Sequence, residues 1–197
     1  MEHIDYFSEE YQFLGQVSID EIHQKGLWHQ TVAFWLYNKE KKIVYLQLRG
    51  PKNRVGPNTF DASSGGHLSA GETKEDGIRE LKEELGVDVN INNCFYLKMY
   101  KNIVHLPHYI NNEFCHIYFV KTDKLLADFV LEEGEVLNLF EFPIEKTDSF
   151  LSGEEVEIVS LSEIRKITLK DMNAFEERVK NNYYHDVFKS LQQIILK

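Results

Sequence analysis

A glycine-rich turn leads directly into a short charged helix, and this pair of elements constrains the fold more than any other part of the chain. The segment from Gly65 to Val87 reads GGHLSAGETKEDGIRELKEELGV. Its apolar residues Ile78, Leu81 and Leu85 recur at the spacing of one helix face, so that face must pack on a core. The glycine after Leu85 is typical of the position just past a helix C-terminus. The segment therefore predicts a helix over 73–86 that lies against the rest of the fold.

Three carboxylates lie on another face of the same predicted helix. Glu80, Glu83 and Glu84 stand at positions i, i+3 and i+4, which are neighbours on a helix surface. Like charges at this spacing repel each other, so a helix that concentrates them needs a compensating charge. Oxygen ligands on a rigid support are what Mg²⁺ and Mn²⁺ prefer. The pattern predicts a divalent cation held by Glu80, Glu83 and Glu84.

Alternating apolar residues predict strands on both sides of this helix. The runs 29–37 and 43–48 are separated by the turn sequence Asn38-Lys39-Glu40-Lys41 and predict a hairpin. A short strand is expected over 60–62. Further strands are predicted over 89–100, 113–120, 136–142 and 156–161, and a C-terminal helix over about 171–196. This order of elements favours a mixed α/β (α+β) sandwich over a doubly wound parallel sheet.

The composition of the chain limits the kinds of partner that it is expected to bind. The formal net charge of −10 argues against non-specific attraction to nucleic acid phosphates. Cys94 and Cys115 have no metal or redox spacing, so no disulfide framework is expected. The sequence contains neither an apolar run of transmembrane length nor a secretory signal pattern. We expect a single cytoplasmic domain over 1–197 that binds neither nucleic acid nor a membrane.

The carboxylate segment resembles the Nudix box, whose pattern is G-x5-E-x7-R-E-U-x-E-E-x-G-U with U aliphatic. The fixed positions are filled by Gly66, Glu72, Arg79, Glu80, Leu81, Glu83, Glu84, Gly86 and Val87. One departure from the pattern is present, because six residues rather than seven separate Glu72 from Arg79. The missing residue falls at the junction of loop and helix, before the carboxylate cluster. The wider likeness covers about residues 20–165.

The resemblance implies a Nudix-type α/β/α sandwich with a mixed sheet and Mg²⁺- or Mn²⁺-dependent hydrolysis of a small-molecule diphosphate. It implies metal ligands at Glu83 and Glu84, with Glu80 as a further ligand or the general base, and the Gly66 carbonyl as an additional ligand. Arg79 is expected to hold Glu72 or a motif glutamate in place. The other candidates for a base or extra ligand are Glu113 and, further along the chain, Glu132, Glu133 and Glu135. Nudix proteins are often dimers, so a homodimer is also expected.

The segments 26–29, 46–49, 60–63, 66–68 and 112–114 are similar to the Nudix branch that includes isopentenyl-diphosphate isomerase. That likeness implies that His29, His67 and His23 contact metal or substrate. Arg49 and Lys52 follow the second predicted strand and are candidate contacts to the diphosphate. The isomerase needs a thiol where this chain has Ser63 and Ser64, and it needs a second acid where Cys115 follows Glu113. A serine hydroxyl is too weak an acid to replace that thiol. Hydrolysis is therefore favoured, and an isomerase-like activity or a catalytically silent binding module stays open as an alternative.

Overall fold

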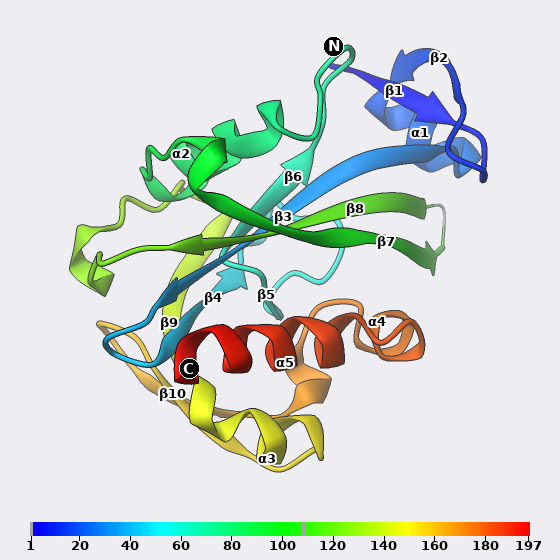
Figure 1. The fold of residues 1–197 in the computed structure, drawn as a ribbon. Helices are drawn as coiled ribbons and strands as arrows, with labels where there is room; N and C mark the ends of the chain where they lie inside the picture. The colour runs from blue at the N-terminus through cyan, green and yellow to red at the C-terminus, as the bar shows by residue number, and fades with distance from the viewer. Residues whose placement is uncertain (1, 108) are drawn as a thin grey trace.

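Strand β3 (Trp28–Asn38) lies at the centre of a mixed β-sheet in the computed structural model, which describes residues 2–107 and 109–197 (Figure 1). It pairs in parallel with β8 (Tyr109–Lys121) and antiparallel with β4 (Ile43–Arg49) and β6 (Ser64–His67). The remaining strands extend the sheet from these neighbours: β1 (His3–Phe7), β2 (Phe13–Ser18), β5 (Phe60–Asp61), β7 (Cys94–Leu106), β9 (Val136–Pro143), β10 (Val156–Val159) and β11 (Ile164–Ile167).

Helices cover both faces of this sheet. They are α1 (Ile19–Lys25), α2 (Arg79–Leu85), α3 (Thr147–Leu151), α4 (Phe175–Lys180) and α5 (Tyr183–Leu196). Single 3₁₀ turns occur at Asp76–Ile78, Ile91–Asn93, Leu126–Asp128, Ile144–Lys146 and Leu169–Asp171. In Figure 1, α2 lies on one side of the central strands while α3, α4 and α5 lie together on the other.

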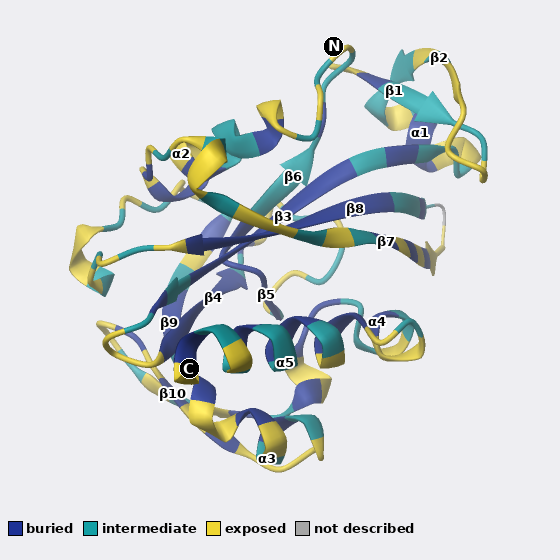
Figure 2. Ribbon diagram, viewed as in Figure 1, coloured by how far each residue is buried: buried dark blue, intermediate teal, exposed yellow. Residues whose placement is uncertain are grey.

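Successive residues of β3 point to opposite faces, so this strand contributes to two cores. Val32 and Phe34 pack in the same buried cluster as Leu81 of α2. Trp35 packs in a second cluster with Phe188 of α5. Figure 2 shows α5 buried along its sheet-facing side and exposed on its outer side. Burial on both faces of the sheet confirms the predicted α/β/α sandwich.

Most predicted strands are present with shifted ends. The hairpin of β3 and β4 is confirmed, and Asn38 pairs with Ile43 across its turn. The strand predicted over 89–100 begins only at Cys94, because Ile91–Asn93 forms a 3₁₀ turn capped by the Asn90 side chain. The prediction of one C-terminal helix over 171–196 was wrong. Asn182 adopts a left-handed backbone conformation with φ 60°, and this divides the segment into α4 and α5.

The charged helix is shorter than the predicted 73–86. A 3₁₀ turn over Asp76–Ile78 precedes α2, which holds regular α-helical geometry only from Arg79. A 3₁₀ turn rises further per residue than an α-helix, so it spans a given distance with fewer residues. Gly77 lies in this turn, where a Cβ would come within 2.8 Å of Val32 and Leu68 side-chain atoms. Gly86 caps the other end of α2 with φ 64°, as expected.

Within the part of the chain that the structure describes, no helix is long and apolar enough to span a membrane.

Candidate active site

A cavity of about 680 Å³ collects most of the residues that the sequence singled out. Its walls come from β6, α2, the loop after β4, the end of β8 and the segment leading into α4. The predicted site residues that line it are Arg49, Lys52, Gly66, His67, Arg79, Glu80, Glu83, Glu84 and Glu113. His29 does not line the cavity, although its ring lies directly behind that of His67.

The carboxylates of α2 lie next to β6, the strand that contains Gly65 and Gly66, and together they line one wall of the cavity. Glu84 is only 7% exposed, and its Oε2 accepts a hydrogen bond of 3.1 Å from the backbone N–H of Gly65. The Glu80 carboxylate packs so closely on Gly66 that a Cβ there would lie 2.4 Å from Oε1. A side chain at position 66 would therefore force the Glu80 carboxylate to move. The third carboxylate, Glu83, has a side chain that is 52% exposed at the mouth of the cavity.

Burial changes the acidity of two of these groups. It raises the pKa of Glu80 to about 7, although the Arg79 guanidinium acts in the opposite direction. It raises the pKa of Glu84 to about 8, and the hydrogen bonds that Glu84 accepts offset only part of this effect. The negative charges at this site are thus under-compensated by the protein itself. An oxygen-only set of such groups fits a hard divalent cation such as Mg²⁺ or Mn²⁺.

Arg79 connects the helix to the loop before it. Its Nε and Nη2 donate to the two carboxylate oxygens of Glu72 at 2.8 and 3.1 Å. Its Nη1 donates to Glu80 and Glu83 at 2.7 and 2.8 Å, and Nη2 also reaches the His67 carbonyl at 2.9 Å. The shortened motif therefore preserves the contact between Arg79 and Glu72.

Arg49 and Lys52, the two predicted diphosphate contacts, both make hydrogen bonds within the protein. Arg49 donates through Nε to the Val55 carbonyl at 3.1 Å and lies 3.4 Å from Asp61 through Nη1. Lys52 donates its ammonium to the Glu133 carbonyl at 2.7 Å. Both side chains line the cavity, so the structure brings them to the predicted site.

The candidate bases are distributed around the cavity. Glu113 lies on β8, where its oxygens accept hydrogen bonds from Asn111 at 2.7 Å and Asn102 at 3.4 Å. Glu132 and Glu135 also line the cavity. Glu133 is not among the lining residues, so only two of the three downstream glutamates face this space.

Three histidines that are distant in sequence form a compact cluster at one end. One ring nitrogen of His23, His29 and His67 lies within 4.8 Å of the corresponding atoms of the other two. Among the described residues, His23 Nδ1, His29 Nε2 and His67 Nε2 are buried without hydrogen-bond partners. Burial lowers the pKa of His23 to about 4 and lowers the pKa of the other two, so all three rings are neutral near pH 7. Neutral imidazole nitrogens are ligands for transition metals more than for Mg²⁺.

The positions that an isomerase would use are occupied differently. The Ser63 hydroxyl donates to the Tyr45 carbonyl at 2.5 Å and accepts from the Leu36 N–H at 2.8 Å, so it is committed to the sheet. Cys115 lines the cavity two residues after Glu113, but burial raises the pKa of its thiol to about 12. Neither group supplies an acid of the strength that such proton transfer needs.

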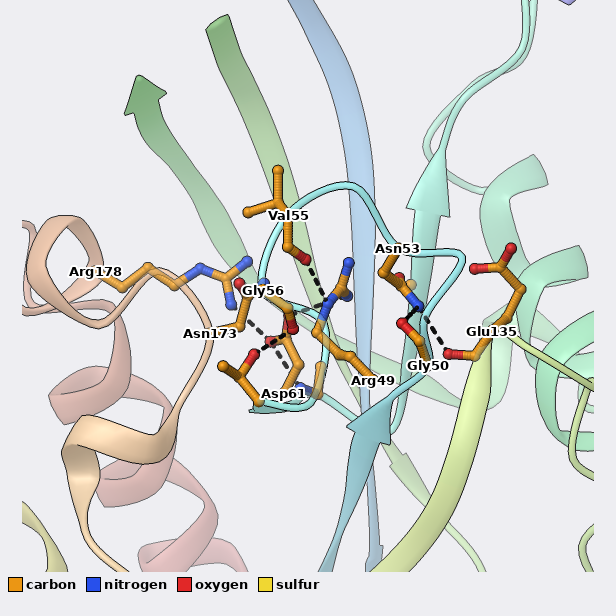
Figure 3. A network of polar contacts seen from close by, with 12 residues as sticks. Arg49, Gly50, Asn53, Val55, Gly56, Asp61, Glu135, Asn173 and Arg178 are labelled. Carbon is orange, nitrogen blue, oxygen red and sulfur yellow. Dashed lines mark hydrogen bonds and ion pairs between the residues drawn. The ribbon is translucent and has the colours of Figure 1, made fainter. Parts of the chain in front are cut away.

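Sequence reasoning missed a buried polar network on the side of the cavity near α4. Figure 3 shows Asp61 between Arg49 and Arg178, with Asn173 beside it. Asp61, Asn173 and Arg178 all line the cavity. Asp61 and Arg178 are 117 residues apart, and no local pattern relates them. Only the bend between β11 and α4 brings them together.

Comparison with known proteins agrees with this geometry. A family model described as the NUDIX domain matches residues 27–179. A Nudix hydrolase of Clostridium acetobutylicum is 39% identical over 155 residues, which cover 78% of this chain and 75% of that protein. Nudix hydrolase 3 of Arabidopsis thaliana is 33% identical over 140 residues, which cover 68% of this chain and 18% of that protein. A crystal structure from Deinococcus radiodurans has a similar fold, with a TM-score of 0.56 and 21% identity over 78% of this chain and 91% of that one.

Proposed function

The chain belongs to the Nudix family of pyrophosphohydrolases, and on that premise we propose that it cleaves the diphosphate linkage of a small-molecule substrate, of the nucleoside-diphosphate type or related to it, with Mg²⁺ or Mn²⁺. The single observation that carries the proposal is the wall formed by α2 and β6. There, two buried carboxylates with raised pKa values lie against Gly65 and Gly66 and open onto the cavity.

Glu83 and Glu84 are the proposed main metal ligands, the Gly66 carbonyl is an additional ligand, and Glu80 is either a further ligand or the general base. A divalent cation bound there supplies charge neutralisation for the diphosphate and makes a water molecule more acidic. Arg79 keeps Glu80 and Glu83 in position and fastens the loop through Glu72. Arg49 and Lys52 lie in the same cavity and orient the phosphoryl oxygens.

Hydrolysis requires a water oxygen to attack phosphorus, a P–O bond of the linkage to break and a base to take the water proton. Glu80 is suited to this role because its pKa of about 7 lies near neutral pH. Glu113 is the alternative from the sheet, and Glu132 and Glu135 are alternatives from the loop before β9. The base is identified by measuring turnover against pH for the Gln variant of each candidate glutamate. Only the variant that lacks the base loses the ionisation that this base contributes to the pH profile.

The histidine cluster favours a second candidate function. The likeness to isopentenyl-diphosphate isomerase implies a metal near His29 and His67, and the unpartnered nitrogens of the cluster fit a transition metal. This candidate is weaker because Ser63 is committed to the backbone and Cys115 is buried. A catalytically silent module is weaker still, since the motif carboxylates are all present.

A substrate panel tests the proposal. The panel contains nucleoside diphosphate derivatives, dinucleotide coenzymes, ADP-ribose and prenyl diphosphates, each with and without Mg²⁺ or Mn²⁺. Cation-dependent release of phosphorylated products from at least one compound supports hydrolysis. Proton exchange into isopentenyl diphosphate without hydrolysis supports the isomerase, and no turnover supports the silent module. The single domain over 1–197, the cytoplasmic location and the homodimer stay predictions.

A further inference from the structure

Helix α4 directs a buried arginine into the cavity from the side opposite α2. Arg178 is only 7% exposed and yet lines the cavity, so its remaining exposure faces this space. Its Nη1 donates to Asp61 Oδ1 at 2.6 Å and to the Tyr184 hydroxyl at 3.2 Å. Arg178 is therefore fixed in place before any ligand binds.

The carboxylate that holds Arg178 is shared. Asp61 Oδ1 also accepts from the Ala62 N–H at 2.8 Å, while Oδ2 accepts from Asn173 Nδ2 at 2.7 Å and lies 3.4 Å from Arg49 Nη1. One carboxylate thus serves two guanidinium groups, as Figure 3 shows. Two guanidinium groups and one carboxylate give the group formed by Arg49, Asp61 and Arg178 a formal charge of +1.

Both arginines also retain unused donors. Across residues 2–107 and 109–197, Nη2 of Arg49 and Nη2 of Arg178 make no hydrogen bond, and the buried Nε of Arg178 makes none either. Guanidinium groups are donors only, so such atoms need an acceptor oxygen from elsewhere. The inaccessible Nε belongs to a guanidinium that lies 4.7 Å from the Tyr183 ring centroid, so it is the Nη2 atoms that remain for an acceptor oxygen of a ligand.

Acidic and basic groups of the cavity come from different elements. The α2 carboxylates lie on one side and Arg178 of α4 on the other, while Arg49 is near enough to Glu84 to lower the pKa of that carboxyl group. A ligand that spans the cavity with phosphoryl oxygens at the arginines meets both the spare donors and the positive charge.

We propose that Arg178, together with Arg49, forms a phosphoryl-binding subsite on the α4 side of the cavity, so that a residue of the C-terminal segment determines which diphosphates bind. The identity of the ligand as the substrate rests on the proposed function. The subsite itself does not, because it binds phosphoryl oxygens whether or not turnover follows. If Arg178 had a purely structural role, its ion pair with Asp61 would serve only to hold α4 against β5.

The test is calorimetric titration of inorganic pyrophosphate into the full chain in EDTA, where α2 holds no metal. Removing one buried donor and its charge in Arg178→Gln is expected to weaken binding about tenfold. Arg178→Lys keeps the charge and is expected to lose less. Lys180→Gln, an exposed change on the same helix, is the matched control and leaves the affinity unchanged.

Circular dichroism establishes that each variant is folded. A folded Arg178→Gln variant that binds pyrophosphate as tightly as the wild type overturns the proposal. If Arg178→Gln does not fold, the charge-conserving Arg178→Lys variant is compared instead, and an affinity equal to that of the wild type overturns the proposal. Because these titrations need no turnover, they separate failure of the subsite from failure of the proposed hydrolysis.

Discussion

Arg79 holds Glu72 through two hydrogen bonds, of 2.8 and 3.1 Å, across a turn that is one residue shorter than in the Nudix motif. The 3₁₀ turn over Asp76–Ile78 lies between these two residues. Arg79 thus connects the loop to the proposed metal-binding face of α2.

A double-mutant cycle over Glu72 and Arg79 should reveal this connection. We expect each of Glu72→Gln and Arg79→Gln to lower the free energy of unfolding, with a coupling between them of about 0.5–3 kcal/mol. The pair is partly exposed, so solvent screening favours the lower part of this range. Urea unfolding provides the measurement. Strictly additive effects would show that the two side chains do not stabilise the loop together.

Gly66→Ala should displace the Glu80 carboxylate. The added methyl group would lie 2.4 Å from Oε1, so the side chain must move away from the proposed metal position. We expect Mn²⁺ affinity to fall by about tenfold or more, since positioning of ligands governs metal affinity. Titration followed by electron paramagnetic resonance measures this. An unchanged affinity would exclude this part of β6 from the metal site.

The stability of the metal-free protein should fall as pH rises from about 5 to 8, and it should level off above that range. Glu80 and Glu84 have folded-state pKa values of about 7 and 8, above the ordinary value of 4.5. The folded state therefore holds protons that the unfolded state has already lost, and this stabilisation disappears as pH passes through the raised values. Thermal unfolding in EDTA measures the slope, which Glu84→Gln should reduce. A slope of the opposite sign would contradict the burial of these groups.

Metal binding should show the reverse dependence. The same carboxylates must lose their protons to act as ligands, so Mg²⁺ or Mn²⁺ affinity is expected to increase over this pH range with release of protons. Calorimetry in buffers of different ionisation enthalpy counts the protons released. Affinity that does not change with pH would place the cation away from Glu80 and Glu84.

The histidine cluster should bind a transition metal independently of α2. His67→Gln is expected to lower Mn²⁺ or Zn²⁺ affinity at the cluster by about tenfold or more, because it removes one of three converging nitrogens. His185→Gln, which changes an exposed histidine of α5, is the control. Metal content after dialysis gives the stoichiometry, and equal content in wild type and His67→Gln would leave the cluster without a metal-binding role.

The predictable parts of this molecule are those that local sequence controls. Alternation in β3 and β4 and the stripe of Leu81 and Leu85 reveal the sheet and the helix that packs on it, because burial imposes those periods directly. The carboxylates of α2 follow from their spacing alone. For these residues, the sequence a few positions to either side is enough to predict the local structure.

Other features depend on contacts between distant segments. The left-handed backbone conformation of Asn182 separates α4 from α5. The spacing of apolar residues in the sequence does not reveal this break. The pairing of Arg178 with Asp61 and the convergence of His23 on His29 and His67 arise only after the sheet has formed. No local pattern could have assigned partners to these side chains.

Turnover by Glu83→Gln tests the central claim most directly. The Glu83 side chain is 52% exposed and touches Arg79 at the cavity mouth, so its loss should leave the fold and the melting temperature nearly unchanged. With Mg²⁺ and the best substrate of the panel in oxygen-18 water, we expect the wild type and the exposed control Lys82→Gln to release labelled phosphoryl product, and Glu83→Gln to lose about 10²-fold or more in turnover. Wild-type turnover in Glu83→Gln, or product without label, would contradict metal-dependent hydrolysis at α2.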